Sequence, residues 1–450
     1  MKIAWFTPFS MQSAIGRASA AIVGELSKHA TVDVWHCETS GVRKTPVRTI
    51  PFSKALAVDL TDLASYDLVI YNLGNHLPFH REIFHLSRRF PGVCILHDFV
   101  MHHFFAAYYL EDLKSPKAYI EAMAKLYGED GRAVAADALA GKRDRVWETD
   151  EVVRYPFFED AIRGAYGVVA HSHFLAERVA KSYCGPVAYI PLAYDVVKPA
   201  RPLTRAQLDV PEDGVLIVTV GHVNRNKRTH AVIEALGRIA GAGDRVTYAV
   251  VGPCDPAYRT ELLELARSRG LERSVRLMGY TPDETLQAYL THADFCVNLR
   301  FPAIEGGSAS LIEEMLYGKA VLVTNTGIYR ELPDDCVIKI SPENEREGLP
   351  PALTILIEDA DHRQRLGNRA REFAEGEFHP ANYAKHLLKF IWEARSAKPL
   401  LQLADRLGAQ MTELGVQAGM EIVDTVSSEA SKMFGGEKGF PQASADKFQR

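Results

Sequence analysis

Two cations follow an apolar run in the second half of the chain. The run spans Val215–Val220, and Arg225 and Lys227 come shortly after it, ahead of a stretch with helical spacing. Free backbone N–H groups at the start of a helix, together with two cations, suit a diphosphate. The glycine patterns of dinucleotide-binding and P-loop proteins are absent, which argues against a nicotinamide enzyme and a P-loop ATPase. A solvated basic turn is the alternative for this element taken alone.

A second loop offers backbone donors and carboxylates. After the apolar run Phe295–Leu299 the chain reaches Glu305, two glycines and small residues, and Glu313 follows inside a predicted helix. Carboxylates repel phosphate, so they are better used to accept hydrogen bonds from sugar hydroxyls. Together the two loops favour a nucleotide-sugar site. Alternatively, Glu305 is a charge at a helix N-terminus and Glu313 forms an exposed pair with Glu314.

The apolar pattern of the chain indicates which elements position these loops. Short apolar runs alternate with helix-length amphipathic stretches, which is typical of a parallel sheet built from βαβ units. The expected strands are Lys2–Phe6, Thr31–Trp35, Leu68–Asn72, Val93–Leu96, Gly167–Ala170 and Val187–Ile190 in the first half, and Val215–Val220, Val246–Val251, Val275–Leu277, Phe295–Leu299 and Ala320–Val323 in the second. Ligands of such sheets bind beyond the carboxyl ends of the strands. We therefore expect an α/β protein with two Rossmann-like, doubly wound domains that face each other across a cleft.

Prolines and charged segments divide the chain. Pro199, Pro202 and Pro211 interrupt the segment between the halves, which indicates a linker. The expected parts are an N-terminal domain over 1–196 with a helical insertion at about 108–151, a second domain over 212–376, a helix over 377–397 that crosses back to the first domain, and a helical tail over 398–450. The insertion is a lid or a surface appendage. The tail has an apolar pattern suited to packing or oligomerisation, and Gly435–Arg450 is expected to be disordered.

The composition limits the possible classes of function. The 450 residues include 47% hydrophobic and 24% charged residues, and the formal net charge is −5. This composition excludes extended disorder and gives no general attraction to nucleic acid or to an anionic membrane. The six cysteines show no metal-ligand or C-x-x-C spacing, so we expect buried free thiols. No apolar run approaches the length of a bilayer span. A cytoplasmic protein is therefore expected, and peripheral contact with the inner membrane face stays open.

The second half resembles the donor domain of glycosyltransferase family 4. The matching stretches are V-T-V-G-H-V-N-R-N-K, A-V-V-G-P-C-D-P, V-R-L-M-G-Y, the E-x(7)-E element and G-K-A-V-L-V-T-N-T-G-I-Y-R-E-L-P. The resemblance implies a GT-B fold and a retaining, metal-independent sugar transfer. It places Lys227 on the donor diphosphate, Glu305 with the amides of Gly306, Gly307, Ser308 and Ala309 on the sugar and phosphates, Glu313 on the ribose, and the backbone near Gly279 and Tyr280 around the base. His222 stands where the family usually has Arg, and Arg225 is the candidate replacement for that charge.

The first half resembles the family's acceptor domain more loosely. Its first loop, T-P-F-S-M-Q-S-A-I-G-R, keeps only Gly16 of the family's glycines. The stretches Y-N-L-G-N-H-L-P-F-H and P-G-V-C-I-L-H-D-F resemble bacterial members that act in surface-polysaccharide assembly. By this match His97 approaches the hydroxyls of the donor sugar and Asp98 orients it. His171 and Ser172, in A-H-S-H-F, are expected on the acceptor side.

Histidines crowd one part of the first half, which raises the question of a metal. They are His76, His80, His85, His97, His102 and His103. His and Asp can build a metal site, yet H-E-x-x-H is absent and the family needs no metal for catalysis. We therefore expect no metal and no cofactor, and we interpret His102 and His103 as structural or acceptor-cleft residues.

The combined hypothesis is a retaining hexosyltransferase of polysaccharide or glycoconjugate biosynthesis. Its partners are a nucleotide diphosphate-sugar donor and a hydroxyl acceptor such as a glycan or a lipid-linked sugar, with no nucleic acid. His97, Lys227 and Glu305 are the predicted catalytic residues. One alternative is a nucleotide-sugar epimerase or hydrolase of the same fold. Another is a non-catalytic nucleotide-sugar-binding protein, suggested by His222, the thin glycine loop and Ala193 in place of the usual glycine. The base, the sugar, the acceptor, the linkage and the oligomeric state leave no trace in the sequence.

Overall fold

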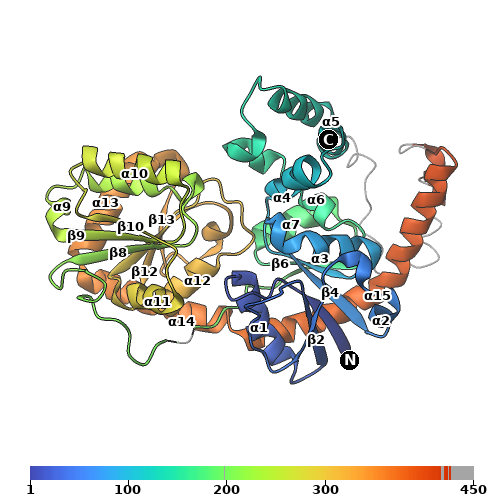
Figure 1. Ribbon diagram of the computed structural model, residues 1–450, viewed down its shortest axis with the longest axis horizontal. Helices are drawn as coiled ribbons and strands as arrows, with labels where there is room; N and C mark the ends of the chain where they lie inside the picture. The colour runs from blue at the N-terminus through green and yellow to red at the C-terminus, as the bar shows by residue number, and fades with distance from the viewer. Residues whose placement is uncertain (197, 417–419, 424, 427–450) are drawn as a thin grey trace. The chain divides into compact units, whose positions relative to one another are not determined.

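The computed structural model describes residues 1–196, 198–416, 420–423 and 425–426. These residues form two compact units. Unit 1 comprises Met1–Pro191, Glu305–Gly307 and the C-terminal segment from Tyr383, and unit 2 comprises Leu192–Ile304 and Ser308–Asn382. Each unit is built on a parallel sheet flanked by helices (Figure 1). The prediction of disorder for Gly435–Arg450 lies outside the described residues.

The sheet of unit 1 has the strand order β3-β2-β1-β4-β5-β6-β7 over the described residues, and its neighbouring strands run parallel. Its strands are β1 (Lys2–Phe6), β2 (Thr31–His36), β3 (Arg48–Pro51), β4 (Leu68–Leu73), β5 (Val93–Leu96), β6 (Gly167–Ala170) and β7 (Val187–Tyr189). Every residue of β4 and β5 is buried, as expected for central strands covered on both faces. The predicted strands of the first half are confirmed, and β3 is an addition to them.

Helices of unit 1 connect these strands. They are α1 (Ala14–Leu26), α2 (Leu60–Ala64), α3 (Leu77–Arg89), α4 (His102–Ala107), α5 (Pro116–Leu139), α6 (Phe158–Ala161) and α7 (His173–Ser182), with the short turns η1 (Ala55–Ala57), η2 (Tyr108–Asp112), η3 (Val146–Glu148) and η4 (Asp150–Arg154). The segment 108–151 is largely helical, and α5 bends at Gly128, whose φ is +68°. The imidazole of His102 is buried against this segment, with Nε2 2.7 Å from the Tyr119 hydroxyl and Nδ1 2.6 Å from the carbonyl oxygen of Tyr155. His102 is therefore a structural residue.

The sheet of unit 2 has the order β10-β9-β8-β11-β12-β13 in the described residues. Its strands are β8 (Val215–Val220), β9 (Val246–Val251), β10 (Val275–Gly279), β11 (Phe295–Asn298), β12 (Ala320–Thr324) and β13 (Ile338–Ile340). Its helices are α8 (Thr229–Leu236), α9 (Ala242–Arg245), α10 (Pro256–Ser268), α11 (Asp283–His292), α12 (Ala309–Leu316), α13 (Glu345–Glu358) and α14 (Ala360–Glu377), with the turns η5 (Arg225–Lys227), η6 (Gly327–Glu331) and η7 (Pro342–Asn344). The predicted strands of the second half are confirmed, and β13 is an addition to them.

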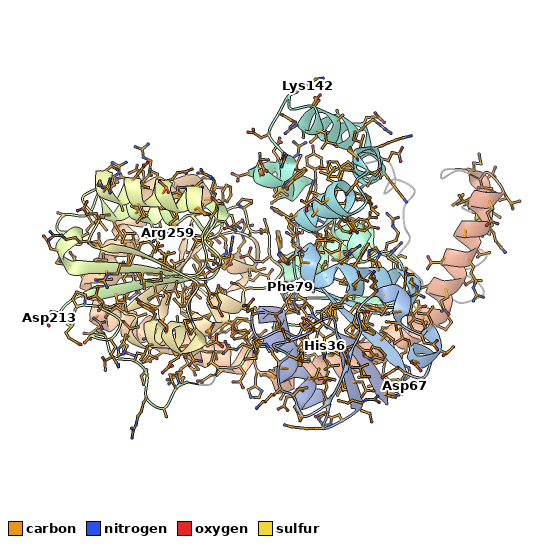
Figure 2. The ribbon with its side chains drawn as sticks, viewed as in Figure 1. His36, Asp67, Phe79, Lys142, Asp213 and Arg259 are labelled. Atoms are coloured by element: carbon orange, nitrogen blue, oxygen red, sulfur yellow. The ribbon has the colours of Figure 1, made fainter. Side chains whose placement is uncertain are left out.

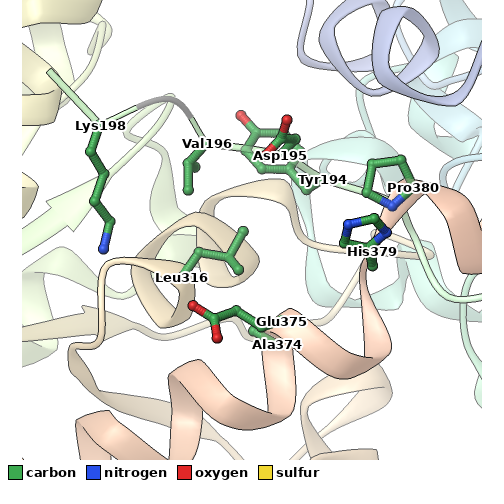
Figure 3. A pocket seen from close by; sticks show the side chains of 9 residues that line it. All are labelled: Tyr194, Asp195, Val196, Lys198, Leu316, Ala374, Glu375, His379 and Pro380. Atoms are coloured by element: carbon green, nitrogen blue, oxygen red, sulfur yellow. The ribbon is translucent and has the colours of Figure 1, made fainter. Parts of the chain in front are cut away.

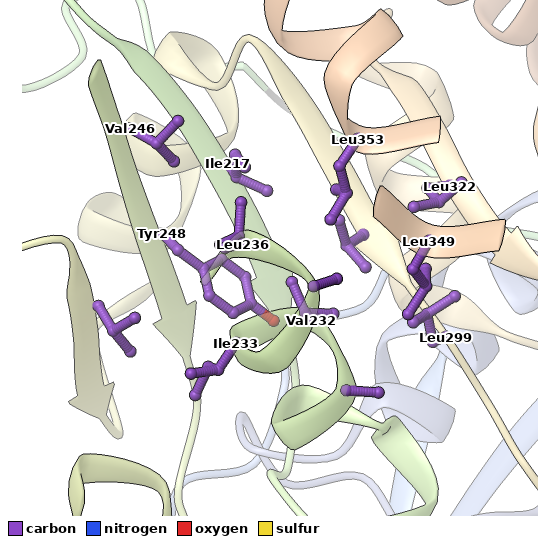
Figure 4. Close-up of a cluster of buried hydrophobic side chains, with 14 of the residues drawn as sticks. Ile217, Val232, Ile233, Leu236, Val246, Tyr248, Leu299, Leu322, Leu349 and Leu353 are labelled. Atoms are coloured by element: carbon purple, nitrogen blue, oxygen red, sulfur yellow. The ribbon is translucent and has the colours of Figure 1, made fainter. Parts of the chain in front are cut away.

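The core of unit 2 lies between its sheet and the helices α8 and α13 (Figure 4). Ile217 and Tyr248 from the sheet pack with Val232 of α8 and Leu353 of α13, and all four are fully buried. The one polar atom of this set is satisfied, because the Tyr248 hydroxyl lies 3.0 Å from Oγ1 of Thr219. This core fixes the strand ends from which the candidate loops leave.

A long helix, α15 (Pro380–Glu413), forms the C-terminal extension and joins unit 1 from Tyr383 onward. It packs on β6, where a Cβ atom on Gly167 would lie 2.8 Å from the ring of Phe390 and 3.0 Å from Cβ of Ala394. Glycine at this position therefore permits the close approach of helix and strand. The helix runs through Pro399 and past the expected division at 397/398, and beyond the proline Gln402 donates to the Tyr166 hydroxyl at 2.8 Å.

Candidate functional site

Both sheets place their loops at a point where the strand order reverses. In unit 2 this switch lies between β8 and β11, and in unit 1 it lies between β1 and β4. Crevices at the carboxyl ends of such strands are the usual ligand sites of doubly wound sheets. The turn with Lys227 follows β8, and the loop that leads to Glu313 follows β11. The two candidate loops of the second half therefore leave the sheet from neighbouring strands.

The turn after β8 is closely packed around its glycines. Gly221 has a φ of +100°, and a Cβ atom on it would lie 2.5 Å from Nζ of Lys227. Gly252, with a φ of +153°, would place a Cβ atom 2.2 Å from the carbonyl oxygen of Gly221. The Lys227 side chain is buried, and its ammonium group donates to the carbonyl oxygen of Val220. The ammonium group is thereby held against the end of the strand.

The two other basic side chains of this turn, His222 and Arg225, lie in different surroundings. His222 is exposed, and its pKa is lowered by desolvation and by the nearby Lys227 ammonium. Arg225 donates to Glu261 on α10 at 2.6 Å, and its guanidinium lies 5.0 Å from the centre of the Tyr258 ring. The ion pair is exposed, so exchanging it for a contact with phosphate costs little, about 1 kcal/mol or less.

The loop after β11 is tied to its neighbours by backbone hydrogen bonds. The Phe301 amide donates to the carbonyl oxygen of Asn226 at 2.8 Å, and the Arg300 amide donates to Oγ1 of Thr324 at 3.0 Å. Ser308 is the N-cap of α12, because its hydroxyl accepts from the Leu311 amide at 3.4 Å. The loop thus joins the turns after β8 and β12 before α12 begins at Ala309.

Glu313 and Glu314 are both buried on α12, so the alternative of an exposed pair is wrong. Oε2 of Glu313 accepts from the Tyr194 hydroxyl at 3.5 Å. Oε2 of Glu314 accepts from Nδ2 of Asn298 at 2.9 Å, while Oε1 has no hydrogen-bond partner within the described part of the chain. Burial raises the pKa of Glu314 to about 8, which makes it a neutral carboxylic acid at pH 7. Sequence reasoning missed this residue because two adjacent glutamates on a helix carry no signal of burial.

The residues predicted to surround the base lie at the end of β10. Gly279 has a φ of +70° and pairs with Gly252 in an antiparallel bridge. Tyr280 follows it with 68% of its side chain exposed. An exposed ring next to free backbone is compatible with stacking on a base.

In unit 1 the loop after β1 is held by its own hydrogen bonds and by side chains from a later part of the chain. Ser13 caps α1 by accepting from the Gly16 amide at 3.0 Å, and a Cβ atom on Gly16 would lie 2.6 Å from the carbonyl oxygen of Pro8. Oε1 of Glu38 accepts from the Phe9 amide at 2.7 Å, and Nε of Arg43 donates to the carbonyl oxygen of Ser10 at 3.0 Å. His36, labelled in Figure 2, ends β2 and lies 3.3 Å from Oε2 of Glu38. These contacts hold a loop that has only one of the family's glycines.

His97 follows β5 and is buried, with both ring nitrogens engaged. Its Nε2 lies 3.0 Å from Oδ1 of Asn72, and its Nδ1 lies 3.3 Å from Nε2 of His171. Nδ1 of His171 lies 3.0 Å from the carbonyl oxygen of Ile190. Burial lowers the pKa of both rings, to about 4 for His171 and well below its usual range for His97. A contact between substrate and either nitrogen of His97 requires one of these hydrogen bonds to be exchanged.

The segment Glu305–Gly307 groups with unit 1, next to His97. The Gly306 amide donates to the carbonyl oxygen of His97 at 2.8 Å, and Asp98 and Glu305 form an antiparallel bridge. Oδ2 of Asp98 accepts from the Asn75 amide at 2.7 Å. Burial, and to a smaller extent the Glu305 carboxylate, raises the pKa of Asp98 to about 7. Unit 1 therefore brings His97, Asp98, His171 and Glu305 together.

Comparison with known proteins finds a family whose pattern matches part of the chain. Residues 200–373 match the family described as glycosyl transferases group 1. The lipopolysaccharide core biosynthesis glycosyltransferase LpsE of Rhizobium meliloti (strain 1021) is 26% identical over 178 residues, which are 39% of this chain and 48% of LpsE. The match thus spans about half the length of this curated relative.

Solved structures share the fold over a larger part of the chain. Sucrose-phosphate synthase from Thermosynechococcus elongatus is 17% identical with a TM-score of 0.59, and the match covers 87% of this chain and 98% of that one. HepE of Anabaena, solved with UDP and glucose, is 16% identical with a TM-score of 0.58 and corresponding coverage of 87% and 99%. The predicted fold class, GT-B with two Rossmann-like domains and a C-terminal helical extension, is confirmed.

The glycosyl transferases group 1 segment holds the predicted donor residues that belong to unit 2. These are His222, Arg225 and Lys227 after β8, Gly279 and Tyr280 at the end of β10, and Ser308, Ala309 and Glu313 at α12. Ser172, predicted on the acceptor side, is buried as the N-cap of α7, where its hydroxyl accepts from the Leu175 amide at 3.2 Å. The burial of Ser172 is therefore explained by its role as the N-cap of α7.

A cavity of about 330 Å³ lies in unit 2 (Figure 3). It is lined by Tyr194, Asp195, Val196, Lys198, Leu316, Ala374, Glu375, His379 and Pro380. Through the Tyr194 hydroxyl its wall is connected to Glu313. Among the residues that the structure describes, no group of three His, Cys, Asp or Glu side chains is placed to hold a metal ion. No helix in the described ranges has both the length and the apolar character to cross a bilayer.

Proposed function

We propose that this protein is a glycosyltransferase that moves a sugar from a nucleotide diphosphate-sugar to a hydroxyl acceptor. The observation that carries the proposal is the switch point of unit 2, where a buried ammonium group and the start of α12 follow the neighbouring strands β8 and β11. The same residues fall inside the segment that matches glycosyl transferases group 1. Cations and helix amides at such a point suit a diphosphate.

Charge on the leaving diphosphate is the main physical problem of the reaction. In our proposal the Lys227 ammonium and the amides of Gly307–Ala309 stabilise this charge as the bond to the anomeric carbon breaks, since the Gly306 amide already donates to His97. These groups are held in place before the substrate arrives, since Lys227 donates to Val220 and the backbone of the β11 loop is tied at Phe301. Because they are preorganised, little reorganisation is needed during the reaction.

In the proposal the carboxylates and His97 form hydrogen bonds with the sugars of the substrate. Glu313 accepts hydrogen bonds from the ribose and Glu305 from the donor sugar. His97, beside Glu305 in unit 1, exchanges one of its present hydrogen bonds for a sugar hydroxyl. We further propose retention of configuration, catalysis without a metal ion, and an acceptor belonging to a surface glycan. The relationship to LpsE, which acts in lipopolysaccharide core biosynthesis, supports that acceptor class.

A transfer assay tests the proposal directly. The purified full chain is incubated with UDP-, GDP-, ADP- and dTDP-sugars, with and without a panel of glycan and lipid-linked acceptors. UDP-glucose is the first donor to test, since the related fold of HepE was solved with UDP and glucose. Nucleotide release that depends on the acceptor and yields an elongated glycan is expected. Isomerised or free sugar formed without acceptor would contradict transfer, and donor binding with no product from any acceptor would contradict catalysis.

Donor binding can be measured separately by thermal unfolding. A donor at 100 times its dissociation constant stabilises the folded protein by about 2.7 kcal/mol, which raises the melting temperature. A donor that raises this temperature identifies the base and sugar before any acceptor is known.

A further inference from the structure

A chain of hydrogen bonds crosses the interior of unit 1 between two backbone carbonyls. It runs from the carbonyl oxygen of Phe6 through the side chains of Asn72, His97 and His171 to the carbonyl oxygen of Ile190. Its four donor–acceptor distances are 3.0, 3.0, 3.3 and 3.0 Å. All five residues are buried, so water does not easily complete a missing bond.

The two ends of the chain fix the direction of the bonds next to them. A carbonyl oxygen only accepts, so Asn72 must turn its Nδ2 toward Phe6 and its Oδ1 toward His97. Nε2 of His97 must then carry a hydrogen atom. At the other end, Nδ1 of His171 must carry a hydrogen atom to donate to Ile190.

Two neutral histidines cannot satisfy the bond between them. A neutral imidazole has one N–H group, and each ring has already used it on its outer partner. The lone pairs of His97 Nδ1 and His171 Nε2 would then face each other at 3.3 Å. If either ring takes its other tautomer, the contact between the rings gains a donor. That ring then turns a lone pair toward Asn72 Oδ1 or toward the Ile190 carbonyl oxygen, and the outer hydrogen bond is lost. One added proton, on either ring, completes all four bonds.

We propose that His97 and His171 bind a single proton between them and that His171 is thereby a positioning residue for His97. The proton gives the contact between the rings a donor and holds the His97 imidazole with Nε2–H toward Asn72. A second proton is excluded, since both nitrogens at the junction would then carry hydrogen atoms and two positive charges would be buried in contact.

Groups on four sides face the pair. His80, on α3, lies close to Asn72 through its Nδ1, 3.0 Å from the Asn72 carbonyl oxygen. Asp98 follows His97 in the chain, and Glu305 pairs with Asp98 in an antiparallel bridge. From α15, the Tyr383 ring is 5.9 Å from the His171 ring, and the Tyr383 hydroxyl has no partner in the described ranges. Burial and His80 oppose the charge on His97, whereas the completed hydrogen bonds favour it.

Nitrogen-15 NMR of the full chain tests the proton directly. Protein labelled at its 16 histidines is titrated from about pH 5.5 to 8.5, and the two rings are assigned from His97→Gln and His171→Gln. We expect the resonances of both rings to change together with the uptake of one shared proton, the ring that carries it showing two protonated nitrogens. Two rings that remain neutral throughout the titration, or that each bind a proton of their own, would overturn the proposal.

His171→Gln provides a second, independent test. Its side-chain amide can donate to Nδ1 of a neutral His97, so the mismatch disappears and the proton is no longer needed. His97 should then show the nitrogen pattern of a neutral ring over the whole range. His29→Gln, at an exposed position on the surface of unit 1, serves as the matched control and should leave the pair unchanged. If His97 keeps its second proton in a folded His171→Gln protein, the proposal fails. If this variant does not fold, the titration of the unaltered protein decides.

The expected effect of His171→Gln on turnover rests on the proposed function, and it is measured in a separate experiment. In the transfer assay His171→Gln should lower kcat about tenfold at pH 7, the size typical of losing a residue that orients a functional histidine, with little change in the donor KM. It should also change the pH profile of kcat, which a purely structural role would not do. An inactive unaltered protein would contradict the transferase, whereas the NMR result on the proton would still stand or fall alone.

Discussion

The two sheets end in sites of different character. In unit 2 the loop after β8 carries a buried cation that a backbone group holds, since Lys227 donates to the carbonyl oxygen of Val220. In unit 1 the corresponding groups are buried polar side chains: His97 after β5 contacts Asn72 of β4 and His171 after β6, and Asp98 accepts from the Asn75 amide. The candidate site of unit 2 thus centres on a positive charge, whereas that of unit 1 consists of buried side chains that hydrogen-bond to one another.

The largest effect is expected from removing the buried cation of unit 2. Lys227→Ala should lower kcat/KM by about 100-fold or more, because it removes a preorganised charge from the leaving diphosphate. The ammonium also contacts the end of β8, so unfolding in urea is measured beside the transfer rate. Arg273→Ala, which removes an exposed cation from the same unit, is the matched control and should leave turnover unchanged. Near-normal turnover of Lys227→Ala would remove this residue from the mechanism.

Buried carboxyls allow the two units to be compared by pH. The pKa of Asp98 in unit 1 is raised to about 7 and that of Glu314 in unit 2 to about 8, both chiefly by burial. A carboxyl with a raised folded pKa contributes stability that is fully present below its unfolded pKa near 4 and is lost as the pH rises through the folded value. Asp98→Asn and Glu314→Gln should therefore gain stability over the unaltered protein at pH 8.5, by roughly 2 to 4 kcal/mol, and gain little at pH 4.

Chemical unfolding at several pH values checks this pair of variants. Both gains should grow as the pH rises above the unfolded pKa, and the gain of Asp98→Asn should level off at a lower pH than that of Glu314→Gln, in line with the order of the two folded pKa values. Glu234→Gln, at an exposed position on α8, is the control for loss of a surface charge. A gain that is the same at pH 4 and pH 8.5 would show that protonation of the buried carboxyl is not its cause.

The close packing of the β8 turn predicts a loss of stability from a single methyl group. In Gly252→Ala the new Cβ atom would meet the backbone of Gly221 at 2.2 Å, at a φ of +153° that L residues rarely adopt. We expect unit 2 to lose roughly 1 to 3 kcal/mol of stability, measured as a lower urea midpoint. Gly376→Ala on α14 has no atom within 4 Å of the added carbon and should be neutral or slightly stabilising. Equal midpoints for the two variants would contradict the packing argument.

The elements that could be predicted from sequence are those with a strong local pattern. The apolar central strands were all found, whereas β3 and β13 were missed because both lie at an edge of their sheet and are short. β3 has the sequence R-T-I-P, and its proline is tolerated only because no further strand pairs beyond it in the described sheet. The expectation of buried thiols also failed at Cys184, which is exposed.

The candidate site likewise contains some residues that a local sequence pattern predicts and others that only the folded sheet brings together. Lys227 and Glu313 follow their strands within one short stretch each, so spacing alone predicted both. The partners of His97 are Asn72 and His171, which are 25 and 74 residues away along the chain. Glu38 and Arg43 similarly reach back about 30 residues to the first loop. Nothing local marks such partners, because the pairing follows from the order of strands in the folded sheet.

The smallest effect is expected at Arg225. It tests whether Arg225 supplies the positive charge that the family usually carries at the position of His222. Arg225→Ala should raise the donor KM about two- to fivefold, since an exposed charge contributes at most about 1 kcal/mol. Glu261→Gln breaks the same ion pair but keeps the cation, so it should leave the donor KM unchanged or lower it. If both variants raise the donor KM equally, the ion pair acts only by fixing the turn. If Arg225→Ala alone raises it, the guanidinium contacts the diphosphate and replaces the arginine that the family usually carries at the position of His222.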